Sequence, residues 1–286
     1  MAEDVVLRTS TPTRVLDGRD LDEVLALLDR DPVADVFVAS RLEQAGLSET
    51  RLGAQVWGFG DRGRLEALCY SGANLVPVQA GSEAVRAFAD RARRQGRRCS
   101  SIVGSSTSVL PLWQLLSPFW GRARDLRDAQ PLMALAGPPA VAPDPGVRRV
   151  RPDELDVLLP ACIAMFTEEI GVSPTAGDGG ALYRARVREL IAQGRAYARI
   201  EAGRVLFKAE IGAATRQVCQ VQGVWVHPSL RGQGLSVGGT AAVVELARAE
   251  IAPVVSLYVN DFNAPARRAY SRVGFAEVGS FTSVLF

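Results

Sequence analysis

The sequence predicts an α/β protein built from two domains, and three observations indicate this class. The chain has 286 residues, 48% of them hydrophobic, which is enough for two packed cores. In both halves, apolar runs rich in β-branched and aromatic residues alternate with segments of helical periodicity. Four prolines between the halves are typical of a linker. We therefore expect domains at residues 1–136 and 147–286, joined by a proline-rich linker at 137–146.

In the first half, residues 1–20 are expected to be an irregular lead-in. Apolar positions recur every three to four residues in four expected helices, at 21–28, 33–45, 82–95 and 109–116. Gly46 and Gly96 follow two of these helices, as C-capping glycines do. Strands are expected at 55–59, 64–70, 74–78, 100–103 and 126–135.

In the second half, the patterns predict nearly the same order of elements. The expected strands lie at 147–150, 195–200, 205–211, 218–226, 254–259 and 278–286. The expected helices lie at 153–166, 181–192, 241–249 and 263–271. The first half therefore looks like a degenerate copy of the second, with an unrelated α/β domain as the alternative.

Composition argues against several classes of partner. The net charge is only +2, which favours neither nucleic acid nor an anionic membrane. The run at 91–98 is the one basic patch and is interpreted as an exposed helix end. The four cysteines are scattered without a C-x-x-C pair, so neither a metal site nor a disulfide framework is expected. With no signal-peptide pattern and no long apolar run, we expect a soluble, cytoplasmic protein.

The stretch 218–249 contains the strongest functional pattern. An apolar strand ending at Val226 is followed by a turn, a glycine-rich segment with Gly232 and Gly234, and a helical pattern. Such a strand, loop and helix form an anion site, because the glycines allow close approach and the first amides of the helix point at the ligand. A P-loop is excluded, since no Gly-Lys-Ser/Thr ending is present. A Rossmann fingerprint is excluded because Val237 occupies its third glycine position.

The remaining pattern resembles the pyrophosphate loop of the Gcn5-related N-acetyltransferases (GNAT), Arg/Gln-x-x-Gly-x-Gly/Ala. Arg231 and Gly234 match it, and Ser236 stands where Gly or Ala is usual. A second motif of the family, Asn, then Tyr seven residues later, then Gly-Phe, is matched by Asn263, Tyr270 and the pair at 274–275.

The resemblance covers about 140 residues of the second half. The whole chain resembles tandem acetyltransferases of actinobacteria, including a group with an uncharacterised amino-terminal domain, which the segment 165–172 matches in particular. This resemblance implies two GNAT-like domains in tandem, each a mixed, mostly antiparallel sheet flanked by helices. The first half has a single glycine at 78–82 and no Arg-x-x-Gly, so we expect it to bind no coenzyme.

For the second half, the resemblance implies acetyl-CoA as cosubstrate and no metal. Pantetheine would be bound by main-chain groups of the motif strand and by Asn263, and the pyrophosphate by the loop amides, with added charge from Arg231. The residues concerned are Val224, Trp225, Val226, Arg231, Gly232, Gln233, Gly234, Leu235, Ser236, Val237 and Asn263.

The implied chemistry is direct attack of a primary amine on acetyl-CoA. A free alkylamine has a pKa near 10, so a base must remove a proton. Tyr270 is the expected acid for the departing thiolate. Glu210, Glu168 and Glu169 are the candidate bases, since Tyr258 stands where several relatives carry a strand Glu.

Two further side chains are given ordinary roles. His227 is interpreted as a turn residue, and Cys219 as a packing residue, because direct transfer needs no acyl-enzyme. The acceptor stays open between a small amine, an amino-acid derivative, an aminoglycoside and a protein amino terminus. The alternatives to an acetyltransferase are a non-catalytic acyl-CoA-binding sensor or scaffold, and an enzyme for longer acyl chains. The sequence does not indicate an oligomeric state.

Overall fold

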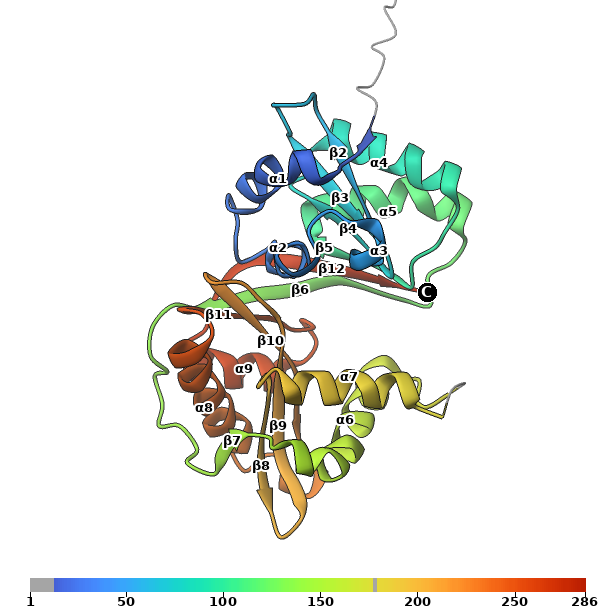
Figure 1. Ribbon diagram of the computed structural model, residues 1–286. Helices are drawn as coiled ribbons and strands as arrows, with labels where there is room; N and C mark the ends of the chain where they lie inside the picture. Colours follow the sequence, from blue (N-terminus) through green and yellow to red (C-terminus); the bar gives the residue numbers. More distant parts are fainter. Residues whose placement is uncertain (1–12, 177–178) are drawn as a thin grey trace, which may run out of the picture. The chain divides into compact units, whose positions relative to one another are not determined.

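The computed structural model describes residues 13–176 and 179–286 (Figure 1). The chain divides into two compact units. Of the described residues, unit 1 comprises 13–130 together with 279–286, and unit 2 comprises those between Pro131 and Val278.

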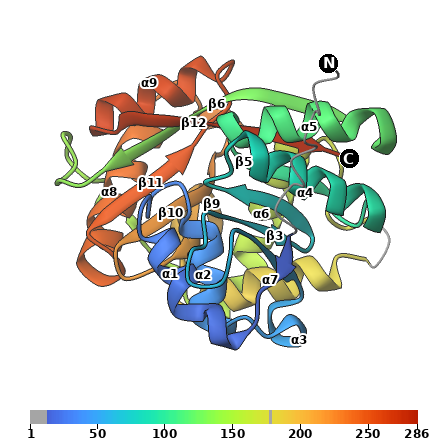
Figure 2. The ribbon, with the colours of Figure 1, turned by 90° about the horizontal axis from the view of Figure 1, so that it is seen from above.

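Unit 1 contains strands in the order β1-β2-β3-β4-β5-β12, antiparallel except for the parallel pair β4–β5. The strands are β1 (Arg14–Val15), β2 (Gln55–Phe59), β3 (Ala67–Ser71), β4 (Asn74–Val78), β5 (Ser101–Ser105) and the end of β12 (Ala276–Leu285). Helices α4 (Ser82–Gln95) and α5 (Ser106–Trp120) lie side by side and pack on one face (Figure 2). The other face is covered by α1 (Leu21–Leu28), α2 (Val36–Ala45) and α3 (Glu49–Leu52).

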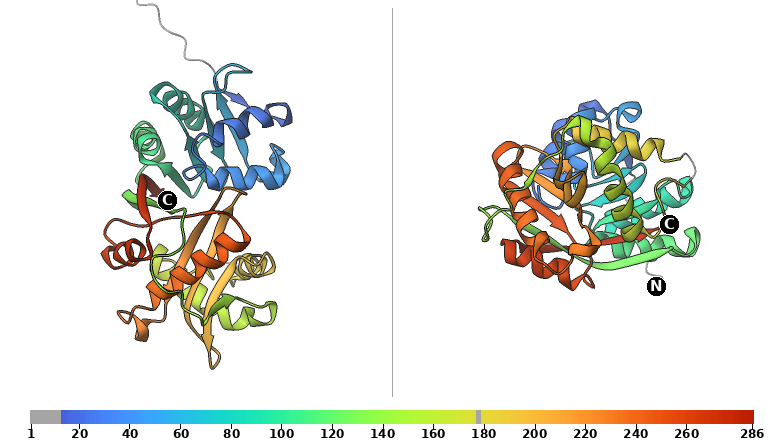
Figure 3. Two further views of the ribbon diagram at one scale, coloured as in Figure 1. Left: turned by 90° about the vertical axis from the view of Figure 1, so that its left-hand side faces the viewer. Right: turned by 90° about the horizontal axis from the view of Figure 1, so that it is seen from below.

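Unit 2 contains strands in the order β6-β11-β10-β9-β8-β7, antiparallel except for the parallel pair β10–β11. The strands are the end of β6 (Asp125–Leu135), β7 (Val147–Arg149), β8 (Ala196–Glu201), β9 (Arg204–Ala214), β10 (Val218–Val226) and β11 (Val254–Tyr258). Helices α8 (Leu235–Glu250) and α9 (Ala264–Val273) cover one face, and α6 (Leu155–Ile170) and α7 (Ala181–Ala192) cover the other (Figures 1 and 3).

The two units have the same strand topology. In each, four antiparallel strands are followed by a parallel fifth strand and an antiparallel sixth, with a helix between the fourth and fifth. The predicted fold class, with mixed and mostly antiparallel sheets flanked by helices, is confirmed.

The compact units differ from the predicted domain ranges at both boundaries. Residues 132–135 of β6 pair with β11 in unit 2, although they were expected in the amino-terminal domain. Residues 281–285 of β12 pair with β5 in unit 1, although they were expected in the carboxy-terminal domain. Each unit thus receives its sixth strand from a segment on the other side of the expected boundary. An apolar run specifies a strand but not its neighbour, so sequence pattern does not reveal this exchange.

Residues 137–146, the predicted proline-rich linker, make main-chain hydrogen bonds to two helices. Residues 137–146 belong to unit 2, where Ala140 N–H donates to Val273 O at 2.8 Å and Asp144 N–H donates to Gly238 O at 3.0 Å. Asp144 also accepts a hydrogen bond from Arg199 at 2.9 Å. The prolines therefore mark a segment that packs along α8 and α9.

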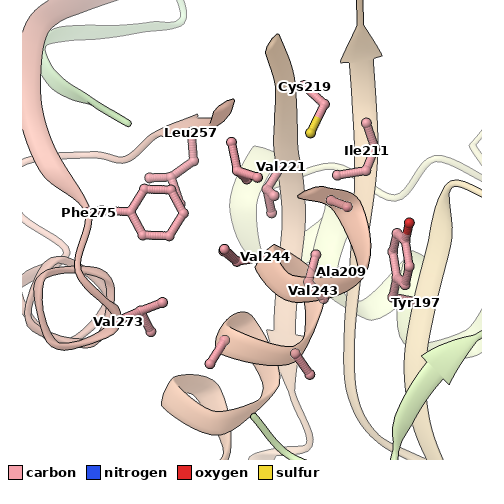
Figure 4. Packing of buried hydrophobic residues seen from close by; sticks show 14 of the residues in the cluster. Tyr197, Ala209, Ile211, Cys219, Val221, Val243, Val244, Leu257, Val273 and Phe275 are labelled. Atoms are coloured by element: carbon pink, nitrogen blue, oxygen red, sulfur yellow. The ribbon is translucent and has the colours of Figure 1, made fainter. Parts of the chain in front are cut away.

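The larger core of unit 2 lies between the sheet and α8. Inward-facing strand residues such as Ala209, Ile211 and Val221 meet Val243 and Val244 of the helix, and α9 adds Val273 (Figure 4). Gly239 allows this close approach, because a Cβ there would lie 2.7 Å from the Phe207 ring. The packing holds the start of α8 at the end of β10.

Most predicted elements agree with the structure, and the differences have local causes. The sequence missed β1 and α3, which have only two and four residues. Helix α5 continues past its predicted end through Pro118 to Trp120, and α6 extends to Ile170. The expected lead-in at 1–20 falls partly outside the described residues.

Candidate functional site

Strand β10 carries a β-bulge between Gln222 and Trp225, shortly before the strand ends and the glycine loop begins. Gln222 pairs with Glu210 on β9, and Trp225 pairs with Lys208, so Gly223 and Val224 together face a single β9 residue. Gly223 has φ +60°, a left-handed conformation that favours glycine. A bulge interrupts the ladder and redirects nearby groups, and bulges are common next to active sites.

Strands β10 and β11 separate close to this bulge. They pair in parallel over three residues only, from Val218 with Val254 to Gln220 with Ser256. Beyond Ser256, β11 keeps its antiparallel pairing with β6, whereas β10 continues along β9 to Val226. Within residues 13–176 and 179–286, no further β10–β11 pair is present. The strands thus form a fork that opens toward the glycine loop.

The loop after β10 ends in a helix start without a side-chain cap. Gly232 and Gly234 have φ +78° and +86°, and an added Cβ would meet nothing within 4 Å at either position. Gly234 is the N-cap of α8 and, having no side chain, makes no cap hydrogen bond to the first turn. The loop is exposed from Arg231 to Gly234, while Leu235, Ser236 and Val237 are half-buried. Amides at such a helix start, assisted by the helix dipole, can bind a phosphate.

His227 shapes the turn that precedes this loop. Its Nδ1 accepts from the Ser229 N–H at 3.3 Å and caps the short helix Pro228–Leu230. The expectation of a turn role is confirmed.

Cys219 is buried in β10, and burial raises the pKa of its thiol to about 12. A protonated, buried thiol agrees with the predicted role of Cys219 as a packing residue.

Arg231 lies against α6 as well as against the loop. Its Nη2 is 2.7 Å from Glu168 Oε2, and its Nε donates to Val226 O at 3.1 Å. The other carboxylate oxygen of Glu168 accepts from Trp225 Nε1 at 3.3 Å. Arg231 and Glu168 are both about half exposed. Glu168 is thus an anchor for two predicted coenzyme-binding residues, which makes it a weaker candidate for the base.

Glu210 lies beneath the bulge in a charged pair. Lys208 Nζ is 3.1 Å from Glu210 Oε2, and Gln222 Nε2 donates to Oε1 at 2.9 Å. Lys208 also lies 3.6 Å from Cys162 Sγ on α6, and the Tyr183 hydroxyl donates to Cys162 O at 3.0 Å. Burial lowers the pKa of Lys208, but the Glu210 carboxylate and Cys162 together outweigh burial and leave this pKa above its usual value.

Tyr270 lies on α9, in the core that faces the fork. Its side chain is 7% exposed and packs edge-on against Phe275. No group in the described part of the chain bonds its hydroxyl. Burial, and then the charge of Glu169, raises the pKa of Tyr270 well above its usual range. The hydroxyl therefore stays protonated at neutral pH.

Asn263 occupies the N-cap of α9. Its Oδ1 accepts from the Ala266 N–H at 3.2 Å, and the residue is exposed. The side-chain amide N–H groups stay available to a ligand.

Among residues 13–176 and 179–286, no group of three His, Cys, Asp or Glu could hold a metal ion. No helix in the same residues is long and apolar enough to cross a membrane.

The sequence analysis missed the burial of Lys208 next to Glu210. A signal was present, because residues two apart on a strand share a face and this polar pair interrupts an apolar run. Its partner Cys162 comes from a helix 46 residues away, which no local pattern reveals.

Comparisons with known proteins agree with this geometry. Residues 181–275 match the profile of the Acetyltransferase (GNAT) family, and residues 54–158 match a Domain of unknown function (DUF4081). A Drosophila protein of known structure has a TM-score of 0.63 at 15% identity, covering 96% of this chain and 98% of its own. A GCN5-related N-acetyltransferase from Sphaerobacter thermophilus has a TM-score of 0.57 at 16% identity, covering 96% and 95%.

A tandem GNAT protein from the clavulanic acid biosynthesis pathway has a TM-score of 0.53 at 16% identity, covering 96% and 98%. At these identities the solved structures establish the fold alone. No curated protein matches the chain significantly. The bulged strand, the fork and the family profile define the class of protein, a member of the GNAT superfamily. More particularly, it is a GNAT protein with an amino-terminal DUF4081 domain.

Proposed function

We propose that the protein is an acetyl-CoA-dependent N-acetyltransferase, which transfers an acetyl group to a primary amine by direct attack in a ternary complex. The observation that carries the proposal is the fork between β10 and β11, which ends at the uncapped start of α8. A fork exposes main-chain groups to an extended ligand arm, and the helix start offers amides to a pyrophosphate. GNAT proteins typically use acetyl-CoA.

In this proposal, the pantetheine arm lies in the fork along residues 224–226 and meets the Asn263 amide. The pyrophosphate binds to the amides of 232–236, because the Val237 N–H already donates to Gly234 O at 2.9 Å. Arg231 then either keeps Glu168 as its partner or exchanges it for phosphate, and a bidentate arginine–phosphate pair is the stronger interaction.

Glu210 is the base that the geometry favours. Its carboxylate lies under the bulge, where Gly223 brings the β10 backbone so close that a Cβ added at Gly223 would lie 3.1 Å from Glu210 Cδ. Proton transfer would run through water, since a free alkylamine must lose a proton before attack. Glu169 is the second candidate, because its charge acts on both Tyr270 and Tyr183.

Tyr270 is the proposed acid for the departing thiolate. Its hydroxyl is protonated at neutral pH and has no protein partner in the described chain, so it can donate to a sulfur in the fork. Positioned acid–base groups contribute about 10²–10⁴-fold to rate.

Unit 1 is proposed to bind no coenzyme. Only residues 79–81 connect β4 to α4, whereas residues 227–234 connect β10 to α8. The Gln79 amide donates to Leu27 O at 2.7 Å and to Asp35 at 2.9 Å, which closes this short connection internally.

Calorimetric titration of the full chain with acetyl-CoA tests the proposal. We expect one site per chain, and roughly tenfold weaker binding in Gly234→Ala, because a Cβ in the left-handed region strains the loop. Gly203→Ala, with φ +72° in the β8–β9 turn, is the matched control and should bind normally. No binding would contradict the proposal, and two sites would contradict the inactive unit 1.

Thiol release from acetyl-CoA, measured with small amines, aminoglycosides and peptides with free amino termini, then separates the alternatives. Release with an amine supports the enzyme and identifies the acceptor class. Binding without release by any amine would favour the sensor or scaffold. We further propose a cytoplasmic protein from an actinobacterium, without a nucleic-acid or membrane partner.

A further inference from the structure

The Lys208–Glu210 pair is not explained by stability. Lys208 is the only lysine of the chain, and its side chain is 1% exposed, whereas that of Glu210 is 12% exposed. Removing two charges from water is costly, and well-packed apolar residues of similar size often serve stability equally well. Buried charged pairs in a site are therefore candidates for function.

The pair lies directly beneath the bulge of β10. A Cβ at Gly223 would lie 3.0 Å from Lys208 Nζ and 3.1 Å from Glu210 Cδ, so only glycine fits above the two charges. The bulge therefore brings the β10 backbone onto the pair at the point where β10 leaves β11.

Lys208 and Gln222 together determine the orientation of the Glu210 carboxylate. One carboxylate oxygen accepts from the ammonium at 3.1 Å, and the other accepts from the Gln222 amide at 2.9 Å. Two bonds from two strands hold the carboxylate in one orientation. Lys208 itself is held from the opposite side by Cys162 at 3.6 Å.

We propose that Lys208 is a positioning residue, whose buried ammonium is the counter-charge of the Glu210 carboxylate and orients it beneath the β10 bulge so that it can accept the proton of the acceptor amine. This inference rests on the proposed function. Lys208 touches no substrate in this arrangement and acts only through Glu210.

The groups around the pair supply no second cation at hydrogen-bond distance from Glu210 among the described residues. Glu169 from α6 contributes negative charge at Tyr183, and Cys162 and Tyr183 are themselves neutral, since burial raises the pKa of both. Arg186 from α7 contributes positive charge at Tyr183. Without Lys208, the Glu210 carboxylate would lose the buried cation that faces it at 3.1 Å.

The single lysine allows a direct test in the full chain. Labelling with ¹⁵N-lysine gives one side-chain NMR signal, whose shift distinguishes ammonium from neutral amine. We expect an ammonium through the neutral range in wild type. In Glu210→Gln, the midpoint of lysine deprotonation should fall by about one to three pH units, because burial is no longer offset by the carboxylate. An unchanged midpoint would overturn the inference.

Activity provides the second readout, with the amine that wild type acetylates fastest. In Lys208→Met, kcat at pH 7 should fall about 10²-fold, as for other displaced catalytic groups. The acidic limb of kcat against pH should also move up by about one to three units, with acetyl-CoA binding retained. Gly203→Ala in the β8–β9 turn, where nothing lies within 4 Å of the added Cβ, is the control and should keep the wild-type profile.

The outcomes separate the two proposals. A folded Lys208→Met protein with an unshifted profile would refute the positioning role alone. If Lys208→Met does not fold, the lysine signal of Glu210→Gln decides the pairing, and Lys208→Met/Glu210→Leu, which removes both charges, should fold but be inactive. Binding of acetyl-CoA without turnover of any amine by wild type would refute the proposed function, and with it the base that Lys208 positions.

Discussion

Substitution of Gly223 by alanine tests the bulge directly. Its φ of +60° lies in the left-handed region, and the new methyl group would lie 3.0 Å from both Lys208 Nζ and Met165 Cε. Ordinary contacts between carbon atoms are about 3.5–4.0 Å. Met165 can rotate away at little cost, but Lys208 can retreat only by weakening its bond to Glu210.

The size of the effect follows from these two terms. A left-handed non-glycine residue costs roughly 1–2 kcal/mol. Breaking a buried ion pair by displacing one partner costs up to about 3–5 kcal/mol. We expect Gly223→Ala to lose between about 2 and 7 kcal/mol of stability, and about 10²-fold in kcat through displacement of Glu210.

Urea unfolding followed by circular dichroism, together with the thiol-release rate, measures both quantities. Gly203→Ala is the matched control, because its φ is +72° and nothing lies within 4 Å of the added Cβ. It should lose only the roughly 1–2 kcal/mol of backbone strain and keep its activity. If Gly223→Ala and Gly203→Ala lost the same stability and the same activity, the close packing of Gly223 against Lys208 and Glu210 would not explain the effect, and our account of the bulge would be refuted.

Three further predictions concern the rest of the chain. Tyr270→Phe should lower kcat, measured by thiol release, by about 10²–10⁴-fold. Its acetyl-CoA affinity, measured by calorimetry, should stay unchanged. An unchanged kcat would exclude the role of Tyr270 as the acid. Hydrogen bonds from Arg148 hold the pKa of Glu154 at about 2, below its usual 4.5, so this pair stabilises the fold above pH 4.5 and stops doing so as the pH falls toward 2. The stability difference between wild type and Glu154→Gln in urea should therefore shrink over that window, and a constant difference would contradict the linkage. A chain of residues 147–286 should be far less stable than the full protein in urea unfolding. It lacks the β6 segment that contains the buried Met133, and its β12 segment has lost its partner strand β5. Equal stability of the two chains would argue against the strand exchange.

Much of the local structure could be predicted because its causes are local. Helices α1, α4 and α7 and strands β2 and β4 begin and end at the predicted residues. Apolar periodicity and capping glycines act within a few residues, so they are readable without the fold. The same holds for the glycine loop and the Asn–Tyr–Gly-Phe motif, whose spacing by itself indicates the family.

The tertiary structure alone decided which distant groups meet. Each sixth strand pairs across the predicted boundary, since a β-strand offers the same backbone groups to any neighbour. Glu168, an open candidate base in the sequence, turned out to anchor Arg231 63 residues away. Lys208, with no assigned role in the sequence, turned out to be the buried partner of Glu210. Periodicity determines which face of an element a side chain occupies, but packing of the whole chain determines what lies opposite, and the chemistry of this site depends on that second choice.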